Sequence, residues 1–243
     1  MENENNLTAA YEPFDSFWEA PANIEKGYSS FNKFYRRNYL KYMPLKPSDN
    51  ILVISCGPGY FVELLKQKGI ESVLGIDSDP EKIAYAGSRR LNCKVARAFD
   101  FLAKKEPVYD VIFAEQELNH LTKTEIRQFI ALCCKNLKPG GMLAVHSLNG
   151  ANPITGAEAL AQNFDHYNTL TEYSLRQVLE NDGFNKITIF PLNLYIFYEN
   201  PLNYIGWFLS GVIQVLLRTA FIFYGKNNRI FTKKIGAVCR KKQ

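Results

Sequence analysis

The chain has 243 residues, of which 47% are hydrophobic and 22% are charged. These values are typical of a folded globular protein, and they exclude a disordered chain, a fibrous chain and a membrane protein with many spans. The five cysteines are scattered and show no Cys-x-x-Cys spacing. They therefore predict neither a disulfide framework nor a metal site, and they favour a reducing cytoplasm.

The net charge of +5 is concentrated at one end of the chain. Seven of the 29 Lys and Arg residues lie from Gly225 onward, where there is no Asp or Glu. The rest of the chain is nearly neutral. This distribution indicates no nucleic-acid partner, but it is compatible with a local anionic contact.

Residues 1–49 are predicted to form an N-terminal helical cap, with one helix over Ile24–Tyr42 that ends before Pro44. The polar start of the chain lacks a basic segment followed by an apolar one, so we expect no secretory signal. Residues 50–243 are predicted to form the main domain, which carries an insert over residues 199–229. The whole is expected to be one globular unit.

From Asn50 onward, short apolar runs alternate with segments of helical spacing. The predicted strands are Ile51–Ser55, Ser72–Ile76, Cys93–Ala96, Val108–Ala114, Met142–Ser147, Lys186–Phe190, Leu192–Tyr198 and Ile230–Arg240. The predicted helices are Tyr60–Lys68, Pro80–Arg90, Thr124–Leu137 and Thr171–Asn181. This alternation predicts an α/β protein with a mostly parallel sheet and helices on both faces.

A nucleotide-binding pattern follows the first predicted strand. Gly57 and Gly59 form a turn before a helix, and Asp77 ends the next strand 18 residues later. Glycines let the backbone approach a ligand, the helix start offers free N–H groups, and the acid can accept hydrogen bonds from ribose hydroxyls. Val62 stands where a dinucleotide fingerprint needs a third small residue, so a ligand without a pyrophosphate is favoured.

Four motifs resemble those of class I S-adenosylmethionine-dependent methyltransferases. They are ILVISCGPGYF at Ile51–Phe61, VLGIDSDP at Val73–Pro80, YDVI at Tyr109–Ile112 and LKPGG at Leu137–Gly141. The resemblance implies a Rossmann-like sheet of seven strands, whose last strand is antiparallel and enters by a hairpin. It also implies S-adenosylmethionine as the cofactor.

The resemblance places the cofactor on residues of four loops. They are Ser55, Cys56, Gly57, Gly59, Asp77, Ser78, Ala98, Phe99, Asp100, Glu115 and Gln116. The chain departs from the family pattern at Val53 and Arg97, where an acid is usual, and at Ser55, where glycine is usual. These departures leave open an alternative, a binding or regulatory module without turnover.

The three histidines fall at or after the predicted carboxyl ends of strands, where open sheets bind ligands. A hydroxyl acceptor needs a base, and histidine suits that role near pH 7. We predict His166 as the first candidate base and His120 as the second, with Asp165 as an orienting acid. His146 lies in an otherwise apolar strand and is predicted to belong to the core.

The segment Asn149–Leu179 is rich in amides, which suit a polyhydroxylated acceptor. Its spacing from His166 to Thr171–Leu175 resembles a subgroup of these methyltransferases associated with bacterial surface glycans. That resemblance implies O-methylation of a sugar or glycan precursor. The alternative is a methyltransferase for a small molecule or a lipid, suggested by the apolar insert.

The insert contains the 22-residue segment Asn203–Tyr224, whose one charged residue is Arg218. A helix is predicted there, starting after Pro201 and ending near Gly225. Because the strands on either side are expected to be neighbours in one sheet, the helix should leave and return on the same side of any membrane. It is either packed on the domain, a homodimer surface, or a helix in a membrane interface. The expected location is the cytoplasm, either free or peripheral at the inner face of the membrane.

The helical spacing of the insert also predicts which face is wet. Ser210, Gln214 and Arg218 are four residues apart and form a polar stripe, predicted to be the wetter face. Trp207 and Ile213, together with Leu217, are predicted to lie largely off that face.

Overall fold

A computed structural model of the chain describes residues 23–103, 108–161, 163–164, 166–193 and 201–242, without the side chains of Gln116 and Glu117. The described elements, in chain order, are α2 (Ile24–Asn38), β1 (Ile51–Ile54), α3 (Tyr60–Gln67), β2 (Val73–Asp77), α4 (Pro80–Ser88), β3 (Cys93–Val95), α5 (Ala98–Ala103), β4 (Tyr109–Glu117), the 3₁₀ helix η1 (Leu118–His120), α6 (Lys123–Asn136), β5 (Leu137–Leu148), α7 (Gly156–Ala161), α8 (Glu172–Asn181), β6 (Phe184–Leu192), α9 (Leu202–Phe223) and β7 (Lys234–Lys241).

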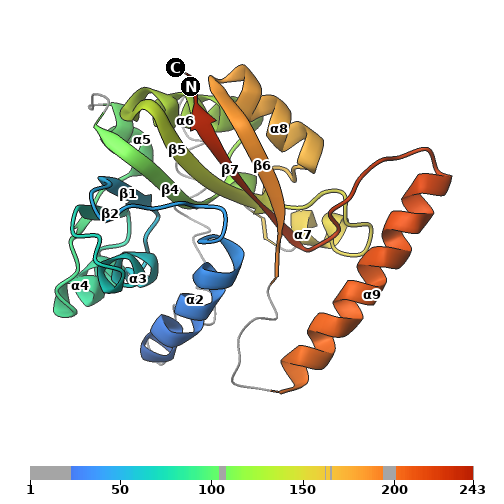
Figure 1. Cartoon of the computed structure of the whole chain (residues 1–243), viewed down its shortest axis with the longest axis horizontal. Helices are drawn as coiled ribbons and strands as arrows, with labels where there is room; N and C mark the ends of the chain where they lie inside the picture. The colour runs from blue at the N-terminus through green and yellow to red at the C-terminus, as the bar shows by residue number, and fades with distance from the viewer. Residues whose placement is uncertain (1–22, 104–107, 162, 165, 194–200, 243) are drawn as a thin grey trace.

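The strands form one seven-stranded sheet in the order β3-β2-β1-β4-β5-β7-β6 (Figure 1). The first five strands pair in parallel, whereas β7 is antiparallel to both β5 and β6. The sheet confirms the predicted Rossmann-like fold with an antiparallel last strand. The apolar helix α9 lies between the last two strands in sequence, as predicted.

Each face of the sheet carries its own apolar layer. Ile51 and Val53 of β1 belong to one cluster with α2 and α3, and Leu52 and Ile54 belong to the other with α6 and α8. All four side chains are fully buried, because successive residues of a strand point to opposite faces. This double burial explains why the strand is a continuous apolar run.

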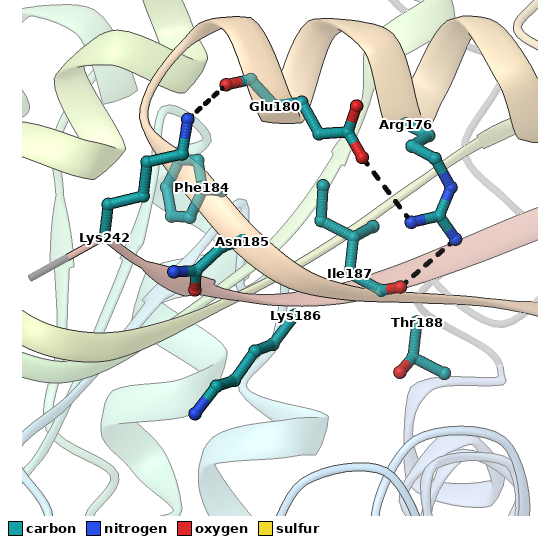
Figure 2. Close-up of a pocket in the computed structure, with 8 residues that line it drawn as sticks. All are labelled: Arg176, Glu180, Phe184, Asn185, Lys186, Ile187, Thr188 and Lys242. Carbon is teal, nitrogen blue, oxygen red and sulfur yellow. Dashed lines mark hydrogen bonds and ion pairs between the residues drawn. The ribbon is translucent and has the colours of Figure 1, made fainter.

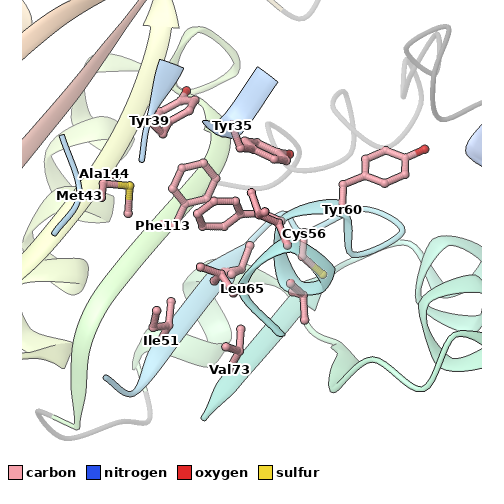
Figure 3. Close-up of a cluster of buried hydrophobic side chains, with 14 of the residues drawn as sticks. Tyr35, Tyr39, Met43, Ile51, Cys56, Tyr60, Leu65, Val73, Phe113 and Ala144 are labelled. Carbon is pink, nitrogen blue, oxygen red and sulfur yellow. The ribbon is translucent and has the colours of Figure 1, made fainter. Parts of the chain in front are cut away.

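The cap helix α2 packs on the sheet through aromatic rings. Figure 3 shows Tyr35 of α2, and Tyr39 directly after the helix, above Phe113 of β4. The ring centroid of Tyr39 lies 4.9 Å from that of Phe113, and the centroid of Tyr35 lies 4.8 Å from that of Phe61 on α3. The aromatic residues of the N-terminal region therefore anchor the cap beside the turn between β1 and α3.

Several boundaries differ from the sequence predictions. Helix α2 ends at Asn38 rather than Tyr42, and β7 begins at Lys234 rather than Ile230. The short helix α7 was not predicted. Strand β6 continues through Pro191, which the prediction treated as a break. Because β6 is at the edge of the described sheet, the missing N–H of proline leaves no ladder bond unmade there.

The insert leaves and re-enters the sheet at one edge. Lys234, the first residue of β7, pairs with Leu148 at the end of β5 and with Leu192 at the end of β6. Both connections to α9 therefore start at the carboxyl edge of the parallel strands. Two amides fasten the returning connection: Asn149 Nδ2 donates to the carbonyls of Ile230 and Thr232, both at 2.9 Å. Asn152 Nδ2 donates to the carbonyl of Phe231 at 2.6 Å.

Replacing Asn149 should destabilise the fold, because two buried carbonyls would lose their donor. We expect Asn149→Ala to lower the free energy of unfolding by about 1–3 kcal/mol. Urea denaturation measures this change. The matched control is Asn181→Ala at an exposed position of α8, which should stay within about 0.5 kcal/mol of the parent. Equal stability of both variants would contradict the structural role of Asn149.

Candidate functional site

The turn between β1 and α3 has an unusual backbone. Ser55, Gly57 and Gly59 have φ values of 54°, 52° and 89°, all in the left-handed region. Glycine adopts this region freely, whereas a residue with a Cβ atom does so at a cost of roughly 1–2 kcal/mol. The positive φ at Ser55 explains why the family pattern has glycine there.

Asp77 connects this turn to the second strand. Its Oδ2 accepts a hydrogen bond from the Gly57 amide at 2.8 Å, and its Oδ1 accepts one from the Asp79 amide at 2.9 Å. The two motifs predicted to bind one nucleotide are therefore in direct contact. Because Asp77 is half-buried, its remaining lone pairs can accept further bonds from ribose hydroxyls. The Asp77 carboxylate, as a hydrogen-bond acceptor beside the glycine turn, fits the ribose of S-adenosylmethionine, which Asp77 would hold there.

The cap helix forms a rim over the glycine turn, which the sequence did not predict. The Tyr28 hydroxyl donates to the Pro58 carbonyl at 2.5 Å, and the Tyr60 hydroxyl donates to the Ile24 carbonyl at 3.3 Å. Burial raises the pKa of Tyr28 well above its usual value, and Arg89, 3.9 Å from the ring centroid, offsets this only in part. Tyr28 thus stays protonated and remains a donor to the turn.

A second tyrosine of α2 reaches the end of β4. The hydroxyl of Tyr35, a fully buried residue, donates to the carboxylate of Glu115. Glu115 is one of the predicted cofactor residues, and this bond fixes its carboxylate at the carboxyl edge of the sheet. The side chain of Gln116, predicted to act beside it, lies outside the described residues.

Cys56 is part of the turn but is not a candidate nucleophile. A hydrogen bond with Cys93, and then burial, raise the pKa of the Cys56 thiol, so it stays protonated. Both sulfur atoms pack against Gly75: a Cβ there would lie 2.8 Å from the Cys56 Sγ and 2.7 Å from the Cys93 Sγ. The pair fills the space beneath the turn.

The remaining predicted cofactor residues lie at the ends of β2 and β3. Ser78 is exposed, and Ala98, Phe99 and Asp100 begin α5. The half-buried Phe99 ring packs on Phe129 of α6, with centroids 5.9 Å apart, so its side chain supports the core beneath α5. The side chain of Asp100 is exposed, as is Arg97 before it.

Two of the three histidines come together at the carboxyl edge. The ring centroids of His120, in η1, and His166, in the loop after α7, lie 4.6 Å apart in an edge-to-face arrangement. The His166 loop is held on η1 because the Tyr167 amide donates to the Asn119 carbonyl at 2.9 Å. His146 is buried within β5, which confirms its predicted place in the core.

The hydrogen bonds of His166 assign its tautomer. Its Nδ1 contacts the carbonyl of Ala159, which can only accept, so Nδ1 carries the proton in the neutral ring. Its Nε2 lies 3.4 Å from the Asn163 amide nitrogen. Since an amide nitrogen can only donate, Nε2 accepts this long hydrogen bond with its lone pair, and an acceptor hydroxyl would have to take the place of Asn163 for Nε2 to act as a general base. Asp165, the predicted orienting acid, lies outside the described residues, and the Ala159 carbonyl occupies the orienting position.

Two asparagines near the histidine pair in sequence, Asn119 and Asn168, have buried side-chain polar atoms without a hydrogen bond among the described residues. These atoms are both side-chain polar atoms of Asn119 and the Oδ1 of Asn168. A buried amide left unsatisfied costs about 1–3 kcal/mol. These atoms therefore favour a polar ligand next to the histidines.

A polar groove of about 670 Å³ lies elsewhere, between α8 and β6 (Figure 2). It opens beside Phe184 and Lys242, at the edge where the parallel strands begin. Its charged side chains already bind the chain: Lys242 Nζ donates to the Glu180 carbonyl at 2.9 Å, and Arg176 lies 3.7 Å from the Glu180 carboxylate. The groove is therefore separate from the site at the carboxyl edge. No group of three metal-ligating side chains occurs among the described residues.

Comparison with known proteins agrees with this geometry. The profile of the methyltransferase-domain family matches residues 28–189, which include most of α2, the glycine turn, Asp77 and both candidate histidines. The chain belongs to the methyltransferase family. S-adenosylmethionine is the cofactor of this family. The seven-stranded Rossmann-like sheet described above is the fold of this methyltransferase.

Curated relatives resemble the methyltransferase over part of their length. It is 30% identical over 131 residues to the human mitochondrial ubiquinone biosynthesis O-methyltransferase, covering 48% of this chain and 35% of that protein. It is 26% identical over 163 residues to a probable S-adenosylmethionine-dependent methyltransferase of Mycolicibacterium smegmatis, covering 65% of this chain and 62% of that protein. The chain thus spans less than two thirds of either relative.

Solved structures share the fold at low identity. A SAM-dependent methyltransferase from Archaeoglobus fulgidus superposes with a TM-score of 0.65 at 19% identity, covering 93% of this chain and all of that one. Phosphoethanolamine N-methyltransferase 2 of Haemonchus contortus, in complex with S-adenosyl-L-methionine, gives a TM-score of 0.59 at 15% identity, covering 96% of this chain and 60% of that one.

Removing the Asp77 carboxylate should weaken cofactor binding. We expect Asp77→Ala to reduce the affinity for S-adenosylmethionine by roughly 1.5–3 kcal/mol, because charge-assisted bonds to the ribose are lost. Isothermal titration calorimetry measures the change. Glu81→Ala, which removes an exposed carboxylate on α4, is the matched control and should bind as the parent does. An unchanged affinity in folded Asp77→Ala would refute the assignment.

Proposed function

We propose that this methyltransferase transfers a methyl group to a hydroxyl of a sugar or glycan precursor, with His166 as the general base. The observation that carries the proposal is the His120–His166 pair at the carboxyl edge, close in sequence to buried amide atoms that make no hydrogen bond among the described residues. A hydroxyl is a donor and an acceptor, so it can satisfy both an imidazole nitrogen and a buried amide.

The residues perform three tasks in this proposal. Bound S-adenosylmethionine supplies the methyl group on a sulfonium centre. Asp77 and the glycine turn hold its ribose, and α2 covers the turn through Tyr28. His166 Nε2 accepts the hydroxyl proton as the acceptor oxygen bonds to the methyl carbon and the sulfur–carbon bond breaks. The products are the methyl ether, S-adenosylhomocysteine and a protonated imidazole, which the Ala159 carbonyl stabilises at Nδ1.

Fewer side-chain amides of the segment Asn149–Leu179 are available to bind a sugar than their number in the sequence suggested. Asn149 and Asn152 donate their side-chain N–H groups to backbone carbonyls before β7. Asn168 Nδ2 donates to the Leu121 carbonyl. The polar groups that support the glycan acceptor are therefore the histidine pair, the Asn119 amide and the Oδ1 of Asn168.

A phenolic hydroxyl is the second candidate acceptor. It is favoured by the curated relatives named ubiquinone biosynthesis O-methyltransferases. A phenol ionises near pH 10 and needs less help from a base than a sugar hydroxyl does. Incubation with isotopically labelled S-adenosylmethionine and either sugar nucleotides and oligosaccharides or catechols, followed by mass spectrometry, separates the two. Transfer to catechols alone would overturn the glycan acceptor.

Substitution of His166 tests the base. We expect His166→Ala to lower turnover by about 10²–10⁴-fold at unchanged affinity for S-adenosylmethionine, because the proton acceptor is lost. His166→Gln is the discriminating control, since glutamine keeps a hydrogen-bonding group but cannot take the proton. Near-normal turnover in His166→Gln would assign His166 a structural role, and the same measurement on His120→Ala would then test the second candidate.

A further inference from the structure

We infer that α9 is a membrane anchor that lies in the plane of an anionic bilayer surface. The helix has 22 residues, of which none is buried. By length and composition it could cross a membrane: an 18-residue stretch of it has a mean hydropathy of 1.6, and no residue of that stretch is buried. Figure 1 shows it standing away from the sheet. Among the described residues, this exposure argues against the alternative in which the insert packs on its own domain.

The exposure of α9 reverses the predicted polarity of its faces. Of the three residues predicted to be wetter, Arg218 is exposed as predicted, but Ser210 and Gln214 are only half-exposed, and Leu217 shares their side of the helix. The most exposed side chains are apolar: Phe208 is 68% exposed, and Leu216 is 64% exposed. The prediction was wrong because a helix that has no apolar core to cover does not need to turn its polar stripe outward.

Water is a poor environment for such a helix. Twelve large apolar side chains of α9 are more than two fifths exposed, on several sides of the helix: Leu202, Tyr204, Ile205, Trp207, Phe208, Leu209, Val212, Ile213, Val215, Leu216, Ile222 and Phe223. A second copy of the chain would cover one face only. The hydrocarbon and headgroup boundary of a bilayer can cover the outward faces together, while the Ser210–Gln214 side stays toward headgroups.

The connections of α9 exclude a transmembrane orientation. A helix of 22 residues is about 33 Å long, close to the thickness of the hydrocarbon core. If it crossed, the ten residues between Phe223 and Lys234 would have to cross back, because Lys234 pairs with Leu192 in the sheet. These ten residues include Lys226 and two asparagines. An extended polar segment cannot cross hydrocarbon, so the helix lies along one surface.

The charge around α9 specifies an anionic surface. Arg218 on the helix, and Lys226 and Arg229 after it, are exposed. From Leu202 to the last residue the chain has no Asp or Glu. Basic residues next to a bilayer each gain about 1 kcal/mol from anionic lipids at low salt. Trp207 near one end of α9 and Tyr224 directly after the other end are residue types that favour the level of the headgroups.

Vesicle flotation tests the anchor without measuring turnover, so its outcome is independent of the proposed function. The full chain should float with vesicles of phosphatidylcholine and phosphatidylglycerol, float less with phosphatidylcholine alone, and be released in part by high salt. Lys226→Gln with Arg229→Gln should weaken binding to the anionic vesicles on the order of tenfold, with little change on neutral ones.

Substitutions on the outward face of α9 test the contribution of its apolar side chains to membrane binding. Phe208→Glu with Leu216→Glu should lose flotation, whereas Asn181→Glu with Thr188→Glu, away from α9, should float as the parent does. Calorimetry with S-adenosylmethionine checks that each variant is folded. Flotation unchanged by Phe208→Glu with Leu216→Glu would overturn the anchor. So would a stable dimer that fails to float, which would assign α9 to a second copy, or resistance to alkaline extraction, which would indicate a span.

Discussion

Parallel hydrogen bonding of β1 with β2 and with β4 brings the carboxyl ends of these strands to one edge of the sheet. The glycine turn, Asp77 and Glu115 are there because each directly follows or ends such a strand. Because β7 is antiparallel, its amino end lies at this same edge, where its first residue pairs with the last residue of β5. The residues predicted to bind the cofactor, the candidate histidines and both connections to α9 therefore share one edge, and the groove of Figure 2 lies at the opposite edge.

The contact between the glycine turn and Asp77 could be predicted from sequence because it depends on local order. Strand, turn, helix and strand follow within about thirty residues, and a parallel pair leaves one arrangement for the acid. The bond from the Gly57 amide to Asp77 is the direct expression of that order. Helix α9 could be bounded correctly for a similar reason, since Pro201 and Gly225 stand at its ends.

The contacts that the sequence did not reveal join residues far apart. Tyr28 and Pro58 are 30 positions apart, and Tyr35 and Glu115 are 80 apart. A run of aromatics indicates burial but not which carbonyl or carboxylate a hydroxyl will reach. The same limit applies to the orientation of His166, which depends on a carbonyl of the unpredicted helix α7. Polar spacing also misassigned the faces of α9, because the spacing alone does not say which side the rest of the chain occupies.

The chain departs from the family pattern at Val53 and Ser55, and the structure shows the surroundings of both residues. Val53 is fully buried in the apolar layer beneath α2, where a carboxylate would need a partner that an apolar side chain does not. Ser55 keeps the left-handed backbone that glycine would adopt freely, so the turn retains its shape. Neither change removes the bond between Gly57 and Asp77, and the geometry that binds a ribose survives both. This preservation favours a working cofactor site over a module that has lost it.

The loop between β5 and α8, which carries His166, is connected by hydrogen bonds to the segment that follows α9. The connection from α9 to β7 is held by Asn149 and Asn152 of the loop that leads to His166. It is also held by α8, where Tyr173 donates to the Asn227 carbonyl at 2.8 Å and Glu172 accepts from the Arg229 amide at 3.1 Å. A surface that binds α9 would thus lie beside the edge that receives the acceptor. If α9 binds a membrane as proposed, an acceptor carried by a lipid would reach the histidine pair from the same surface, whether its hydroxyl belongs to a sugar or to a phenol.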